Sequence, residues 1–166
     1  MLKWIGIIMI IFGTTMTGYD LYIERKKSKM KTEKFIKVLL FMRDEMRYSK
    51  AYIENVFLRC ADVDIQTEAF FLHISEALKA GETLEKVWRA EVNETEYLCT
   101  EAQKALLDLA DVLGTVDMEV QSAHIERCIC DLEAVLKKQT EEFNKKGTLS
   151  LKIGVLSGVI ISILLF

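Results

Sequence analysis

The 166-residue chain contains no proline and only two histidines. Proline breaks or kinks helices, so its absence means that no helical segment here is interrupted by a proline. Short alternating apolar runs, which are typical of strands, are also absent, and apolar residues recur instead at spacings of three and four. The sequence therefore predicts an all-α fold, an antiparallel helical bundle.

The motifs of common enzyme classes are missing as well. The chain has no P-loop, no GxGxxG fingerprint, no HExxH zinc motif and no GxSxG nucleophile elbow. His124 and Cys128 could share a helix face, but Cys130 would point away from them and no CxxC pair completes a zinc site. Catalysis by paired carboxylates stays open in so acidic a chain, although a solvated charged face is the simpler interpretation. We expect no enzyme activity, no cofactor and no metal.

The two ends of the chain are its most apolar stretches. Residues 2–19 read LKWIGIIMIIFGTTMTGY, and residues 149–166 read LSLKIGVLSGVIISILLF. About 20 apolar residues span the hydrocarbon core of a bilayer, and slightly shorter runs do so with modest thinning. The first run lacks a small-residue cleavage site and precedes a basic segment, which favours an uncleaved anchor over a signal peptide. The sequence predicts transmembrane helices at 1–24 and 148–166 around a helical domain at 25–147.

Charge divides the chain into basic stems and an acidic centre. Residues 25–37 contain seven basic residues and one acid, and residues 137–152 contain five basic residues and two acids. Residues 44–133 hold 20 acidic residues against 8 basic ones, a net charge of −12. Basic segments flanking membrane spans mark the cytoplasmic side, so the domain is expected in the cytoplasm and both termini outside. An acidic body also argues against nucleic-acid binding, which requires a basic face.

Polar residues and glycines divide the central domain into helices. We expect Asp64 to cap a helix over 65–80 and Gly81 to end it in the left-handed conformation. Thr83 can then cap a short helix whose apolar face includes Trp88.

Asn93 and Glu96 resemble a capping box, which predicts a further helix over 94–113. Gly114 marks a turn, and the last helix of the domain is expected over 116–146. The apolar residues predicted for its inner face are Val120, Ala123, Ile125, Cys128, Leu132, Val135, Leu136 and Phe143.

Small residues recur every fourth position in the last apolar stretch: Ser150, Gly154, Gly158 and Ser162. Such a stripe permits close backbone contact with another membrane helix, and the first span is the nearest candidate. Alternatively, these glycines reflect only the general frequency of glycine in membrane helices.

The segment LADVLGTVDMEVQSAHI, at residues 109–125, contains Leu-Gly, an Asp three residues on, a Gln four further and then His-Ile. Together with LKAGETLEKVW at 78–88 and EMRY at 45–48, it resembles the stage III sporulation protein AB family. That family is similar to the F-type inner-membrane platform protein of type II secretion and type IV pilus systems. The resemblance covers essentially the whole chain, and one departure is at 51–56, where the family usually has Pro-Leu.

The resemblance implies a bundle of the secretion F-domain type in the outer forespore membrane, with the domain in the mother-cell cytoplasm. It implies two kinds of partner: a secretion-type sporulation ATPase, stage III sporulation protein AA, and other forespore channel components. Asp117, Gln121 and His124 are the expected partner contacts, with packing inside the fold as their alternative role. Gly81 and Gly114 are expected to form structural turns.

Two functions follow from different classes. The first is a non-enzymatic platform that couples the ATPase to the membrane channel around the forespore. The second is a membrane-tethered signalling or adaptor protein that dimerises through its transmembrane helices. A sensor should carry a ligand-binding domain outside the cell, and almost nothing is expected there. A membrane enzyme ranks third, and whether the protein forms homo-oligomers stays open.

Overall fold

The computed structural model describes residues 2–48, 53–114 and 117–164, and for 2–15, 17–18, 118, 146–155 and 157–164 it describes only the backbone. Within these ranges all regular secondary structure is α-helical, which confirms that the fold is all-α. The chain divides into two compact units, a terminal unit of residues 1–29 with 138–166 and a central unit of residues 30–137.

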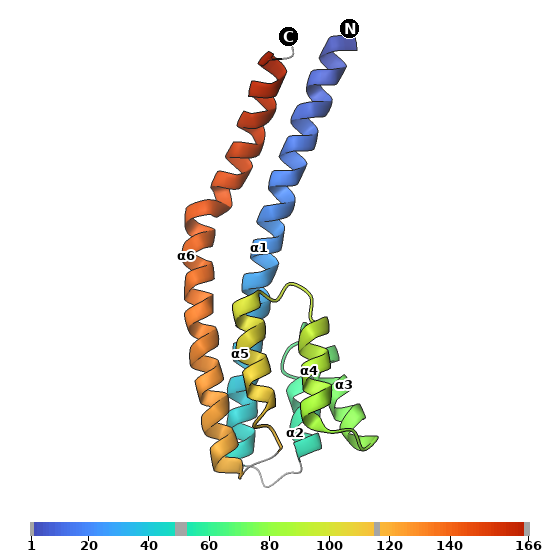
Figure 1. Ribbon diagram of the computed structural model, residues 1–166, viewed down its shortest axis with the longest axis vertical. Coiled ribbons are helices and arrows are strands. Elements are labelled where there is room, and N and C mark those ends of the chain that lie inside the picture. Colours follow the sequence, from blue (N-terminus) through green and yellow to red (C-terminus); the bar gives the residue numbers. More distant parts are fainter. Residues whose placement is uncertain (1, 49–52, 115–116, 165–166) are drawn as a thin grey trace. The chain divides into compact units, whose positions relative to one another are not determined.

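Six helices are described (Figure 1): α1 (Leu2–Tyr48), α2 (Ile53–Ala61), α3 (Glu68–Lys79), α4 (Leu84–Glu94), α5 (Thr100–Ala110) and α6 (Met118–Leu164). The long helices α1 and α6 each contain 47 residues and belong to both units. Among the described residues, no helix is both long enough and apolar enough to cross a membrane.

In the terminal unit, α1 and α6 run antiparallel. The rings of Tyr22 and Phe143 lie 5.2 Å apart between centroids. Six residues further along α1, the Ser28 hydroxyl accepts a hydrogen bond from Gln139 Nε2 at 3.1 Å. Because the contact position advances along α1 while it retreats along α6, the two helices run in opposite directions.

Aromatic side chains from four helices form the centre of the core in the central unit. The ring of Phe70 lies 5.1 Å from Phe35 and 5.2 Å from Trp88, both in edge-to-face geometry. Phe57 and Phe71 complete the group. Edge-to-face pairs add to the stabilisation from burial alone, and the buried Trp88 Nε1–H donates to the Leu106 carbonyl at 2.7 Å. This bond joins α4 to α5 inside the core.

The predicted start of α3 is wrong. Thr67, not Asp64, occupies the N-cap position, and the helix begins at Glu68. The Asp64 carboxylate accepts instead from the Gln66 backbone N–H at 3.0 Å and from Lys34 of α1 at 2.8 Å. A local turn and a partner on another helix therefore take the carboxylate that was expected to cap α3.

The predicted capping box before the next helix is also wrong. Helix α4 continues through Asn93 to Glu94, and α5 begins only at Thr100, with Cys99 at its N-cap position. The Asn93 side chain accepts a hydrogen bond from Gln103 at 3.2 Å and makes no cap. Between the helices, Tyr97 adopts a left-handed φ of 60°, which breaks the chain direction.

The predicted inner face of α6 is correct in part. Ile125, Cys128 and Leu132 are buried, whereas Val120 and Ala123 are exposed. Gln121 occupies the inward position one turn before Ile125, so the buried stripe follows 121, 125, 128 and 132. Spacings of four, three and four residues put these side chains on one face of the helix, the face that packs against the core. The first residue of this buried face is the polar Gln121, so a prediction from apolar residues alone does not find it.

Candidate partner-binding site

The central unit contains two glycine turns, at Gly81 and Gly114. Gly81 has φ +88° and follows α3, where its N–H donates to Leu78 and the next N–H donates to Ala77. These are the paired bonds of a Schellman motif, which satisfies the last carbonyls of a helix. Gly114 has φ +80°, and a Cβ added to it would lie 3.3 Å from Leu84, the first residue of α4. This contact brings the Gly114 turn against the helix that follows the Gly81 turn.

Gln121 connects the Gly114 turn to α6. Its side chain is buried, and its Oε1 accepts a hydrogen bond from the Gly114 N–H at 3.2 Å. The Gln121 N–H in turn donates to the Asp117 carbonyl at 3.0 Å, in the first turn of α6. Of the three predicted contact residues, Gln121 is thus turned into the fold, Asp117 is exposed and His124 is half-buried.

His124 lines a groove between the end of α5 and the first turns of α6. The groove has a volume of about 350 Å³, with Ala105, Leu109, Val112 and Cys128 at its apolar parts. Its charged and polar residues are Asp108, Asp111, Asp131, Arg127 and His124. Three carboxylates against one guanidinium give the α5–α6 groove a negative balance.

The charged residues of the α5–α6 groove differ in how firmly they are held. Asp111 is paired with Arg89 of α4, which also bonds Glu85 at 3.2 Å. These neighbouring carboxylates raise the pKa of Arg89. Asp108 and Asp131 are exposed and lie on different helices. All three carboxylates of the groove are thus exposed, and one of them is held by an ion pair, an arrangement suited to a basic side chain of a partner.

Cys128 forms part of the floor of this groove and is not a nucleophile. Its S–H donates to the Ala105 carbonyl at 3.3 Å. Burial, together with the nearby Asp131 and Asp108 carboxylates, raises the pKa of the thiol to about 12. A thiol with such a pKa is protonated at neutral pH and chemically inert.

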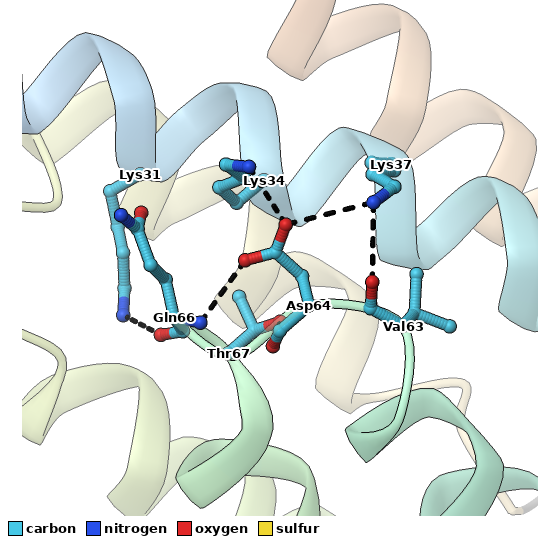
Figure 2. Close-up of polar contacts among 7 residues, drawn as sticks. All are labelled: Lys31, Lys34, Lys37, Val63, Asp64, Gln66 and Thr67. Atoms are coloured by element: carbon cyan, nitrogen blue, oxygen red, sulfur yellow. Dashed lines mark hydrogen bonds and ion pairs between the residues drawn. The ribbon is translucent and has the colours of Figure 1, made fainter.

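A second polar cluster joins the connection between α2 and α3 to α1 (Figure 2). The buried Asp64 carboxylate pairs with Lys34 at 2.8 Å and with Lys37 at 3.7 Å. Lys37 also donates to the Val63 carbonyl at 3.2 Å, and Lys31 donates to the Gln66 carbonyl at 2.7 Å. The Lys34 ammonium holds the pKa of the Asp64 carboxyl below its usual value.

Three basic residues at the end of the first stem, Lys31, Lys34 and Lys37, therefore bind the α2–α3 connection of the protein itself. Lys31, Lys34 and Lys37 are three residues apart, which puts them on one side of α1. That spacing was visible in the sequence as a signal for a shared partner. The partner was not, because the α2–α3 connection lies about 30 residues further along the chain.

The remaining predicted positions fall on the terminal unit. Ser150, Gly154, Gly158 and Ser162 belong to α6, but their side chains lie outside the part that the structure describes. Among the described residues, no group of three or more histidine, cysteine or acidic side chains has a geometry that could hold a metal ion.

The family model described as stage III sporulation protein AB matches residues 3–166. Neither the curated proteins nor the solved structures contain a significant match.

Proposed function

Because the chain belongs to the stage III sporulation protein AB family, with a role in stage III of sporulation, we propose that it is a non-enzymatic membrane platform protein. In this proposal it couples a cytosolic secretion-type ATPase, stage III sporulation protein AA, to the channel around the forespore. Other forespore channel components are its further partners. The bundle is of the secretion F-domain type.

The observation that carries this proposal is the acidic α5–α6 groove. It contains His124, and the exposed Asp117 lies directly before the same helix. Both residues belong to the segment 109–125, which carries the closest resemblance to the family. Complementary charges speed the encounter of two proteins and select the correct partner. A partner that presents Arg or Lys to this groove would be recognised in this way. A platform protein acts by binding its partners and requires no catalytic site.

Membrane attachment is proposed from the sequence. The apolar runs within 1–24 and 148–166 are long enough to anchor the protein, and the basic stems beside them suit an anionic cytoplasmic leaflet. The central domain then lies in the mother-cell cytoplasm, attached to the outer forespore membrane, where an ATPase can reach it.

Binding of the ATPase tests the proposal. The full-length protein in detergent micelles should bind the purified ATPase, and the affinity should fall as salt concentration rises. Asp108→Lys and Asp131→Lys should weaken binding, because they place positive charge in the α5–α6 groove. Glu133→Lys is the matched control, since it makes the same charge change on α6 outside the residues that line the groove. Equal affinities for all these variants would remove the groove from the contact.

The adaptor alternative is supported by the spacing of Ser150, Gly154, Gly158 and Ser162. If the protein works by dimerising through this stripe, Gly154→Ile or Gly158→Ile should abolish self-association in membranes. ATPase binding would then be absent in the wild type. Under the platform proposal, ATPase binding is present and independent of these two substitutions.

A further inference from the structure

Helices α3 and α4 border a shallow hollow on the surface of the central unit, which shares no lining residue with the α5–α6 groove. Its volume is about 470 Å³. Ala77 and Ala80 on the α3 side line it, together with Val87 and Ala90 of α4. Because three of these four side chains end at Cβ, the two helices pack without filling the space between their outer edges. An apolar floor is thus left open to solvent.

The rim of the hollow is acidic. Glu76, Glu82 and Glu91 line it, together with Lys86 and His73. Lys86 bonds Glu82 at 3.1 Å, and His73 lies 3.4 Å from Glu91. Glu76 is exposed on α3. The combination of an apolar floor with a negative rim fits an apolar side chain that has basic side chains beside it.

We propose that the α3–α4 hollow is the anchoring site for the ATPase, and that it takes one apolar side chain flanked by Lys or Arg on a helix or loop of that partner. This inference rests on the proposed function, in which the ATPase is the partner. It adds the surface and the chemistry by which the ATPase is held.

Energetics distinguish the two concave sites. The α5–α6 groove is mostly polar, and solvent-exposed charges mainly accelerate and orient association. Stable complexes depend on a few well-packed apolar anchors that exclude water, with charged residues around them. Among the described residues of the central unit, the α3–α4 hollow supplies such a floor with its rim already charged. Complementarity of charge selects a basic partner over an acidic or neutral one.

Filling the hollow is the direct test. Ala90→Leu and, separately, Ala80→Leu would place a side chain in the space that the partner is to occupy. We expect each to weaken binding of the ATPase to the full-length protein in detergent micelles by about tenfold or more. Ala134→Leu is the matched control, because Ala134 is exposed on α6 and does not line the hollow. Circular dichroism and thermal unfolding should match the wild type for all three variants.

The rim is tested by Glu76→Lys, with Glu133→Lys as its control. Glu76→Lys should slow association and flatten its dependence on salt, whereas Glu133→Lys should leave both unchanged. If the wild-type protein binds the ATPase and the filled variants bind it equally well, the inference is overturned while the proposed function stands. Absence of binding by the folded wild-type protein would overturn both.

Discussion

The buried Oε1 of Gln121 accepts a hydrogen bond from the backbone N–H of Gly114, at a distance of 3.2 Å. One side chain therefore fixes the turn between α5 and α6 to the first turns of α6. The same turn lies close to Leu84 at the start of α4, where a Cβ on Gly114 would come within 3.3 Å of that side chain. Three helix ends meet there, next to the groove proposed for partner recognition.

Gln121→Leu should destabilise the protein. The substitution replaces the polar amide with an apolar side chain of similar size and removes the acceptor for the Gly114 N–H; loss of a part-buried hydrogen bond of this kind costs about 0.5–1.5 kcal/mol. Urea denaturation of the full-length protein in detergent would measure the change in unfolding free energy. Gln103→Leu is the control, because the bond of Gln103 to Asn93 is exposed and should contribute little. Equal stabilities of these two variants would show that the Gly114 contact is not structural.

Alanine at the two turn glycines should give unequal losses of stability. Both residues have positive φ, so each substitution places a side chain in the left-handed region at a cost of about 1 kcal/mol. A Cβ at position 81 meets nothing within 4 Å, whereas a Cβ at position 114 meets Leu84 at 3.3 Å. Gly114→Ala should therefore lower the melting temperature more than Gly81→Ala does. The reverse order in thermal unfolding would contradict the packing of Gly114 on α4.

The Lys34–Asp64 pair predicts a specific dependence of stability on pH. The pKa of Asp64 is lowered by Lys34, so the pair contributes stability above the carboxyl pKa of the unfolded chain, which is about 3.9. That contribution is lost as the pH falls through the lower pKa of the folded state. Asp64→Asn should therefore be less stable than the wild type at neutral pH, and the difference should shrink below about pH 4.

Denaturation curves of the two proteins between neutral and acidic pH provide the measurement. Asp62→Asn, at an exposed position in the same connection, is the control and should show a much smaller difference at neutral pH. A difference between wild type and Asp64→Asn that stays constant with pH would rule out an ion pair as its source.

The four cysteines should react with thiol reagents in a fixed order. Burial raises the pKa of Cys60 and of Cys128 to about 12, so both thiols are protonated and shielded at neutral pH. Cys130 is exposed and Cys99 is half-buried. Brief alkylation of the native protein followed by mass spectrometry should therefore find Cys130 modified first and Cys99 more slowly. Cys60 and Cys128 should react only after denaturation, and early modification of Cys128 would show that α5 and α6 separate readily.

Much of the helical pattern could be predicted from the sequence, because its causes are local. The spacing of Leu84, Val87 and Trp88 predicts a helix face, and all three are buried. Gly81 and Gly114 could be placed at turns because glycine alone adopts positive φ without a steric penalty. These features depend on neighbours within a few residues, which a sequence displays directly.

The tertiary structure decided where polar side chains find their partners. Asp64 was expected to cap α3, but Lys34, 30 residues away, takes its carboxylate. Gln121 turns inward because the Gly114 turn offers a backbone donor, and Asp108 and Asp131 share a groove only because α5 packs on α6. A helix period fixes which residues share a face of one helix, whereas the face of another helix that they meet depends on packing across the core. The sequence by itself thus determined the helices and their charge, and the packing determined the concave sites through which the protein is proposed to act.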